Sequence, residues 1–436
     1  MEKTRSLNIG FISTRFAGLD GVSLESDKWA SVLREFGHRC FWFAGELDRP
    51  ESVSMLVPEA FFGHPSVQEI TSSLFSAQKR TRAMTDELHR QKDFLKDHLY
   101  RFIERFGVDL IIPENALSIP MNVALGMAIT ELVAETGIPT IAHHHDFSWE
   151  RPRFLTSACQ DILNMAFPPD LPSIKHVVIN SPAQADLAAR RSISAHLVFN
   201  VMDFDHAAPL PRESAAEFRA RMGFGEKDII VLQPTRVVSR KGIEQAIYLV
   251  ELLNEPSARL VVSHSAGDEG LQYAEWIQRW AEHQGVPLHF IQNPRAAGVS
   301  GDSAAEAPFS LQDVYPHADM ITYPSIHEGF GNAFLEAVYY RKPIMVNRYS
   351  VFIVDIEPKG FDVVGIDGYV TPGAVKEVAE LLHDPARRAQ MVEKNWQLAR
   401  THFSYRILRK ELANLLSAFF GIAPPRGLFS RFFGGE

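Results

Sequence analysis

The chain has 436 residues, of which 46% are hydrophobic and 22% charged, and its net charge is −9. This composition is typical of a globular protein with ample core material, and the length predicts two or three domains. The acidic balance and the absence of a basic block disfavour nucleic acid as a partner. No apolar run approaches the roughly 20 residues that a membrane helix needs.

The cysteines and the first residues indicate the compartment. Only Cys40 and Cys159 are present, which is too few for a disulfide scaffold and agrees with a reducing environment. The residues after Met1 lead straight into a strand-like segment, so we expect no signal peptide. The sequence therefore predicts a cytoplasmic protein.

The first half of the chain alternates short apolar runs with helical patterns. The runs that predict strands cover residues 7–13, 40–44, 108–112, 138–142, 176–180 and 195–199. Strands and helices of these lengths, in alternation, predict a parallel α/β sheet.

The loop at residues 14–23 follows the first predicted strand and contains Gly18 and Gly21. A helical pattern follows from Leu24 to Phe36, so strand, glycine loop and helix resemble the first unit of a Rossmann-like half. The loop lacks the G-x-G-x-x-G spacing of dinucleotide-binding proteins. A plain turn is the alternative interpretation.

The strand at 138–142 leads into three successive histidines, His143 to His145, and then Asp146. Ligands of open α/β sheets gather beyond the carboxyl ends of strands, so this run is a candidate site. Adjacent residues on an extended chain point to opposite faces, which does not suit a metal site. We therefore expect no metal here, and structural histidines are the alternative to a binding role.

Trp149, Arg151 and Arg153 follow within a few residues. An aromatic face suits a sugar, and arginine binds carboxylate or phosphate groups. We hypothesise that these three residues bind an acceptor, either a polar sugar or an anionic small molecule. The alternative is a solvated helix start with Arg–Glu pairing.

The second half repeats the alternation. A predicted strand at 228–233 leads into a charged loop with Arg236, Arg240 and Lys241, and a helical pattern follows at 243–253. We interpret Arg240 as facing solvent. Further strands are expected at 259–263 and 288–292, and helices at 271–283, 372–398 and 405–420.

The stretch from Thr322 to Asn347 organises the second half. It predicts a strand end, a loop with Gly329 and Gly331, a helix at 333–340 capped by Asn332, and a strand at 344–346. The loop contains Glu328, and the helix contains Glu336 about one turn in.

A helix start offers free amides to a phosphate, and carboxylates accept hydrogen bonds from sugar hydroxyls. Glu328 and Glu336 flank such a helix start, so the ligand that this stretch suggests is both phosphorylated and polyhydroxylated. A nucleotide sugar fits that description.

The segment Glu328-Gly-Phe-Gly-Asn-Ala-Phe-Leu-Glu336-Ala resembles the signature of glycosyltransferase family 4, the retaining glycosyltransferases of the GT-B fold. The resemblance implies an α/β architecture of two Rossmann-like parallel-sheet domains facing a cleft, with the C-terminal helix crossing back to the first. It implies an acceptor-side domain at 1–204, a nucleotide-sugar domain at 205–402, and a crossover helix and tail at 403–436.

The resemblance also implies roles for particular residues. Arg236 and Lys241 would hold the donor diphosphate, Glu328 the sugar, and Glu336 the ribose. The residues that it implies for catalysis are His145 with Asp146, or His143, together with Arg236, Lys241 and Glu328. The residues that it implies for donor binding are Gly18, Gly21, Arg236, Lys241, His264, Asn293, Glu328, Gly329, Phe330, Gly331, Asn332 and Glu336.

The implied reaction is retaining transfer of a hexose from a UDP-, GDP- or ADP-sugar to a polar sugar or an anionic small-molecule acceptor. No D-x-D motif is present in the donor region, so we expect a hexosyltransferase that needs no metal cofactor. The alternatives are transfer to a lipid-linked or membrane acceptor, a GT-B sugar-nucleotide epimerase, and a non-catalytic nucleotide-sugar-binding protein. The aromatic and basic tail at 424–436 suggests either a membrane contact, or docking on the N-terminal domain of the same chain or on a subunit partner, as in a homodimer.

Overall fold

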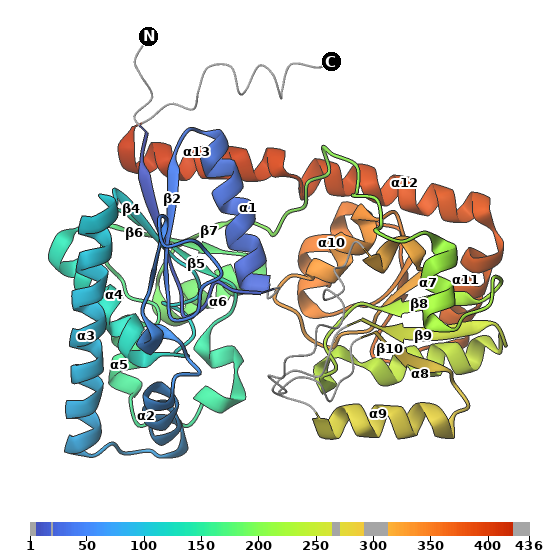
Figure 1. Ribbon diagram of the computed structural model, residues 1–436, viewed down its shortest axis with the longest axis horizontal. Coiled ribbons are helices and arrows are strands. Elements are labelled where there is room, and N and C mark those ends of the chain that lie inside the picture. Colours follow the sequence, from blue (N-terminus) through green and yellow to red (C-terminus); the bar gives the residue numbers. More distant parts are fainter. Residues whose placement is uncertain (1–5, 19–20, 264–270, 292–312, 422–436) are drawn as a thin grey trace, which may run out of the picture. The chain divides into compact units, whose positions relative to one another are not determined.

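The computed structural model describes residues 6–18, 21–263, 271–291 and 313–421, and it divides the chain into two compact units (Figure 1). Unit 1 comprises Met1–Val201 and Tyr405–Glu436, and unit 2 comprises Met202–Ser404. No helix in the described part of the chain is both long and apolar enough to cross a membrane.

Unit 1 is built on a seven-stranded sheet in the order β3-β2-β1-β4-β5-β6-β7, whose described strand pairs are all parallel. Its strands are β1 (Asn8–Ile12), β2 (Arg39–Ala44), β3 (Ser54–Leu56), β4 (Leu110–Pro113), β5 (Thr140–His144), β6 (Ile174–Val178) and β7 (Ala195–Leu197). Its helices are α1 (Gly21–Glu35), α2 (Pro65–Ser76), α3 (Arg82–Phe106), α4 (Val123–Thr136), α5 (Gln160–Ala166), α6 (Ser181–Arg191) and α13 (Tyr405–Phe420). The order reverses direction between β1 and β4, the position where open α/β sheets bind ligands.

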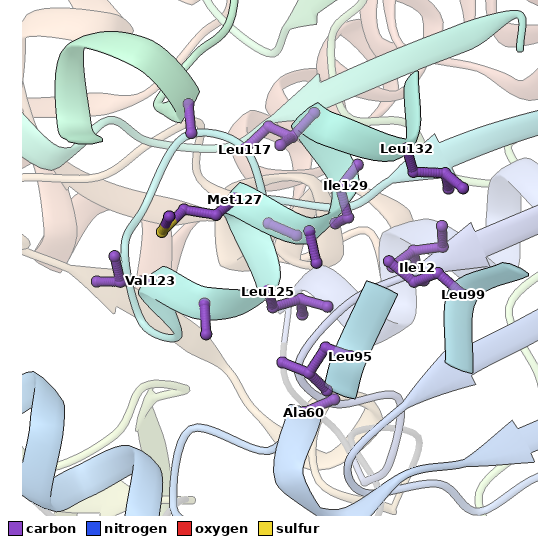
Figure 2. Packing of buried hydrophobic residues seen from close by; sticks show 14 of the residues in the cluster. Ile12, Ala60, Leu95, Leu99, Leu117, Val123, Leu125, Met127, Ile129 and Leu132 are labelled. Atoms are coloured by element: carbon purple, nitrogen blue, oxygen red, sulfur yellow. The ribbon is translucent and has the colours of Figure 1, made fainter. Parts of the chain in front are cut away.

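One face of this sheet packs against α2, α3, α4 and α5. Side chains from β1, α3 and α4 point into this apolar layer, among them Ile12, Leu99 and Leu125 (Figure 2). The layer explains why α3 carries an apolar stripe, since Leu95, Leu99 and Phe102 are buried there. Phe94 of the same helix is 40% exposed.

The opposite face of the sheet is covered by α1 and α13. Leu408, Leu412, Leu415 and Leu416 of α13 join Trp29 and Leu33 of α1 in one buried cluster. Arg409 of α13 also pairs with Glu35 at the end of α1, with 2.7 Å between Nε and Oε2. The last helix therefore returns to the first unit, as the sequence predicted.

Unit 2 has a six-stranded sheet in the order β10-β9-β8-β11-β12-β13, again with parallel pairs throughout its described part. Its strands are β8 (Ile229–Gln233), β9 (Ala258–Val262), β10 (Leu288–Phe290), β11 (Met320–Tyr323), β12 (Ile344–Asn347) and β13 (Val364–Ile366). Its helices are α7 (Ala215–Met222), α8 (Ile243–Leu253), α9 (Leu271–His283), α10 (Asn332–Tyr339), α11 (Pro372–His383) and α12 (Pro385–His402). Helices α8 and α9 pack on β8 and β9, while α11 packs on β12 and β13. Two parallel α/β sheets confirm the predicted fold class.

Two local predictions were wrong. Gly21 is not a loop residue but the first residue of α1, because a first helical turn needs no apolar side chain and the apolar pattern starts only later. Asn332 does not cap α10; Gly331 occupies the N-cap position, and Asn332 is the first helical residue. The segment 372–398 is helical as predicted, and it is divided into two helices, since Asp384 caps a new helix with Pro385 at its first position.

Candidate functional site

The three successive histidines are divided between the two faces of β5. His144 lies on one face, where its Nε2 is 2.9 Å from Nδ1 of His176. His143 lies on the other face and stacks on Trp29 with 4.1 Å between ring centroids. His145 follows on the same face as His143, with 4.5 Å between those two rings. This alternation is what an extended chain imposes.

Glu114, the residue directly after β4, joins the two histidines that share a face. Its Oε2 is 2.9 Å from His143 Nδ1 and 3.3 Å from His145 Nε2. Glu114 is fully buried. Burial alone would raise the pKa of its carboxyl group, but the charges and hydrogen bonds of the two histidines outweigh burial and lower that pKa to about 2. Glu114 is therefore a buried carboxylate.

The turn that holds His145 and Asp146 is built by Asn115, whose φ of 59° lies in the left-handed region. Its side-chain oxygen accepts from the backbone N–H of His145 at 3.0 Å, and its amide donates to Oδ1 of Asp146 at 2.9 Å. Arg151 donates from Nε to Oδ2 of Asp146 at 2.7 Å. His145, Asp146 and Arg151 thus lie together in one turn, held by Asn115 and by the Arg151–Asp146 pair.

The side chains of Trp149 and Arg153 both contact other side chains of unit 1. The Trp149 ring stacks on Phe147 at 4.5 Å between centroids, and Arg190 lies over the Trp149 ring at 5.6 Å. Arg153 lies over the ring of Phe154 at 4.7 Å. The helix start expected here is two short 3-10 turns, Ser148–Glu150 and Pro152–Phe154.

In unit 2 the charged loop after β8 meets the loop after β11. Lys241 ends the short turn Ser239–Lys241 and forms a buried hydrogen-bonded ion pair with Oε1 of Glu328. The two loops are also joined through their backbones, since the N–H of Ile326 donates to the carbonyl of Arg240 at 2.9 Å. Gly242 is required beside this contact, because a Cβ there would lie 2.5 Å from the Pro324 carbonyl oxygen. Sequence positions almost ninety residues apart thus form one charged centre.

Glu328 is ionised in this centre. Burial raises the pKa of its carboxyl group, but the charge of Lys241 and the hydrogen bond that Lys241 donates outweigh burial, so its pKa is lowered. Nη1 of Arg240 lies 3.9 Å from Oε2 of Glu328, so the interpretation of Arg240 as solvent-facing was wrong. Arg236 has an exposed side chain, and its charge acts on Lys241. The arrangement presents two further cations beside a buried Lys–Glu pair.

The start of α10 completes the unit 2 site. Gly331 has a φ of 123°, and a Cβ on it would lie 2.2 Å from the hydroxyl oxygen of Tyr349. That hydroxyl donates to the carbonyl of Phe330 at 2.7 Å, which fixes the loop at the helix start. The helix is eight residues long. The N–H groups of Phe334 and Leu335 donate to the carbonyl of Gly331 at 3.0 and 3.3 Å, and the positive end of the helix dipole favours an anion at this end.

Glu336 lies one turn inside α10, as expected, and its Oε2 accepts a hydrogen bond from the Tyr315 hydroxyl at 2.8 Å. The Tyr315 side chain is fully buried. This contact orients the carboxylate without burying it completely, since Glu336 is half-buried. A half-buried, oriented carboxylate can accept hydrogen bonds from a pair of vicinal hydroxyls.

The remaining donor-binding candidates are less informative. Gly18 has a φ of 77°, and its N–H donates to Oδ2 of Asp48 at 3.1 Å. Gly21 begins α1 in the same unit. His264 and Asn293 lie outside the described residues.

Four contributors were missed by the sequence analysis. Glu114 follows a strand just as His143 does, so its position at a sheet edge was the available signal. Arg240 is adjacent to Lys241, but the turn that directs both toward Glu328 has no sequence marker. Tyr315 and Tyr349 act through contacts with residues 21 and 19 positions away, and no local pattern reveals such contacts.

Fold and sites together define a class. Two parallel α/β units, one with a cationic centre beside a helix start and one with a histidine–carboxylate cluster at a strand end, are what an enzyme handling a nucleotide sugar needs.

The comparisons with known proteins agree with this class. The chain is 32% identical over 434 residues to mannosylglucosylglycerate synthase of Thermotoga maritima, covering 91% of this chain and 97% of that protein. It is 29% identical over 442 residues to mannosylglucosylglycerate synthase of Petrotoga mobilis, covering 93% of this chain and 100% of that protein. Among solved structures, the HepE protein of Anabaena in complex with UDP and glucose superposes with a TM-score of 0.60 at 15% identity, covering 94% and 100%. No family model matches.

The chain belongs to glycosyltransferase family 4 (glycosyl transferases group 1), and it is a hexosyltransferase of the GT-B fold.

Proposed function

We propose that this enzyme transfers mannose, with retention of configuration, from a nucleoside-diphosphate mannose to glucosylglycerate or a similar small acceptor that carries a carboxylate. The observation that carries the proposal is the similarity, over almost the whole of both chains, to a protein named mannosylglucosylglycerate synthase. The acceptor in that name is a polar sugar and an anion at once. The acceptor chemistry expected from Trp149, Arg151 and Arg153 has the same two parts.

The unit 2 centre supports the donor half of the proposal. A diphosphate leaving group gathers negative charge as the glycosidic bond breaks, so fixed cations stabilise the transition state more than the ground state. Lys241 and Arg236 supply that charge, with Arg240 beside them. The amides at the start of α10 bind the phosphates, Glu328 orients the sugar and Glu336 holds the ribose.

The unit 1 cluster supports the acceptor half. His145, with Asp146 beside it, contacts the transferred sugar, and Arg151 and Arg153 attract the acceptor carboxylate. Arg151 is already paired with Asp146, so it positions the loop as well as contributing charge. The leaving phosphate itself takes the acceptor proton on the same face, because retention without an enzyme nucleophile requires attack from the side of departure. The transfer needs no metal ion.

We place the reaction in the cytoplasm. Both cysteines are free and buried, which suits a reducing compartment.

The test is a product analysis with purified enzyme. GDP-, UDP- and ADP-linked mannose and glucose are each incubated with glucosylglycerate, with glucosylglycerol as the matched acceptor without a carboxylate, and with no acceptor. We expect free nucleoside diphosphate and a new α-linked glycoside only with glucosylglycerate and a mannose donor. An inverted linkage, or equal rates with glucosylglycerol, would refute the proposal. Conversion of the donor without any acceptor would indicate an epimerase instead.

The arginines give a second test of the same site. Arg151→Ala and Arg153→Ala are expected to raise KM for glucosylglycerate while leaving KM for the donor unchanged. Equal acceptor KM in wild type and both variants would remove these residues from the acceptor site.

A further inference from the structure

The Glu114, His143 and His145 cluster has the geometry of a metal site. One ligand atom from each of the three residues lies within 4.8 Å of the others. The carboxylate comes from the end of β4 and the imidazoles from the end of β5, so the neighbouring strands of a parallel sheet hold all three. The three side chains belong to unit 1 alone.

The two distances from the Glu114 carboxylate to the imidazoles fit a common ion. Zinc–nitrogen and zinc–oxygen bonds are about 2.0–2.2 Å long, so two ligands of one ion lie roughly 2.9–3.4 Å apart at octahedral or tetrahedral angles. Oε2 of Glu114 is 2.9 Å from Nδ1 of His143 and 3.3 Å from Nε2 of His145. Both spacings suit an ion bound at these atoms, and His143 is held in place by its stacking on Trp29.

The buried charge also favours a cation. Oε1 of Glu114 is buried and has no hydrogen-bond partner among the described residues, and such an atom calls for a ligand or an ion. Oε1 of Glu25 also lacks a hydrogen-bond partner among the described residues. Glu25 is fully buried, and its charge acts on His145. Lys28 pairs with the other Glu25 oxygen at 2.9 Å.

The donor set selects the kind of ion. Two imidazole nitrogens and one carboxylate suit first-row transition ions such as Zn²⁺, Fe²⁺ or Co²⁺, whereas Mg²⁺ and Ca²⁺ prefer oxygen ligands only. Two histidines and one glutamate leave at least one coordination position open. Alternation along the strand excludes only His144 from the cluster; His143 and His145 are two positions apart, share a face, and meet a carboxylate from the next strand.

We propose that unit 1 binds one divalent transition-metal ion through Glu114, His143 and His145, with the remaining positions open. The ion does not supply the transfer chemistry, but the site shares His145 with the proposed function. Because the ion occupies Nε2 of His145, its binding restrains a residue proposed to contact the sugar.

The test uses the untagged full-length enzyme after removal of bound metal with a chelator. Co²⁺ is titrated into the protein while its visible absorption is recorded, and Zn²⁺ and Mg²⁺ are then added as competitors. We expect the cobalt signal to saturate at one equivalent, to be abolished by Zn²⁺ and to persist in excess Mg²⁺. No saturable signal in the wild-type protein, or displacement by Mg²⁺, would overturn the proposal.

Matched variants locate the ion. Glu114→Gln and His145→Ala are expected to weaken Co²⁺ binding at least about 100-fold, since even residues behind a ligand contribute about 10–100-fold. The control is His144→Gln, which removes the intervening imidazole from the opposite face of β5 and should bind as tightly as wild type. Circular dichroism checks that each variant folds. If Glu114→Gln does not fold, His145→Ala alone tests the location of the ion, because the His145 side chain is partly accessible. Unchanged binding in a folded His145→Ala, or equal loss in His144→Gln, would place the ion elsewhere.

Discussion

Lys241 and Glu328 form a buried ion pair in unit 2, so a substitution of either residue affects stability. Each side chain has about a tenth of its surface exposed, so removing either partner leaves the other charge buried and unpaired. Such a loss typically costs about 3–5 kcal/mol of stability. Effects on activity therefore have to be separated from effects on folding.

Lys241→Ala is expected to lower kcat for the proposed mannosyl transfer by about 10²–10³-fold, because we propose that the lysine stabilises charge that develops only in the transition state. Lys376→Ala is the matched control, since Lys376 is an exposed lysine that pairs with Glu380 on α11. Steady-state kinetics with the donor varied give the result, and thermal melting reports stability. A folded Lys241→Ala enzyme with wild-type kcat would remove the lysine from the reaction.

Gly331→Ala is expected to destabilise the loop before α10 and to weaken donor binding. A side chain at a φ of 123° is strained, at about 1–3 kcal/mol, and its Cβ would meet the Tyr349 hydroxyl. Gly373→Ala is the control, because Gly373 sits in a helix with only ordinary contacts. Differential scanning calorimetry and donor titration measure the two effects. Equal behaviour of the two variants would show that the loop tolerates a side chain.

At the scale of single elements, the turn Ser148–Glu150 has a titratable residue with a shifted pKa. Burial raises the pKa of Glu150 from 4.5 to about 7, although its carboxylate accepts a hydrogen bond from the N–H of Phe147 at 2.7 Å. The folded protein thus holds this proton more tightly than the unfolded chain does. Its contribution to stability is complete below pH 4.5 and is lost as pH rises to about 7.

Glu150→Gln should remove that dependence, because glutamine accepts the same hydrogen bond and does not ionise. We expect the melting temperature of the variant to rise relative to that of wild type between pH 4.5 and 7. Above pH 7 the difference between the two melting temperatures should stay constant. Melting curves across this range measure it. A difference that does not change with pH would show that Glu150 titrates normally.

Helix α13 makes a prediction about unit 1. Leu412 is fully buried against α1 and the sheet, so Leu412→Ala should cost about 2–5 kcal/mol of stability. The control is Asn414→Ala, since Asn414 is exposed on the same helix. Denaturant unfolding monitored by tryptophan fluorescence measures both. Equal midpoints would mean that α13 does not stabilise the unit.

At the scale of the whole molecule, the proposed chemistry makes the transfer independent of metal. Cations of the chain occupy the place where many sugar-nucleotide enzymes use a divalent ion, so EDTA treatment should leave the rate of transfer within about twofold of the untreated rate, a difference well under 1 kcal/mol in barrier height. The rate of product formation before and after chelation checks this. A rate restored only by Mg²⁺ or Mn²⁺ would contradict it.

The sequence by itself determined the alternation of strands and helices, the fold class and the family. Short-range patterns predict these properties: apolar runs of strand length, helical periodicity, and a motif whose glutamates and glycines lie within ten residues. The signature at 328–337 marked the donor-side loop because the loop and its helix are continuous in the chain.

Only the tertiary structure decided which distant residues act together. Glu114 meets His143 and His145 because β4 and β5 are neighbours in the sheet, and Arg240 turns toward Glu328 because two loops share a backbone hydrogen bond. Contacts of this kind depend on strand order and burial, and the local sequence does not encode them in a readable pattern.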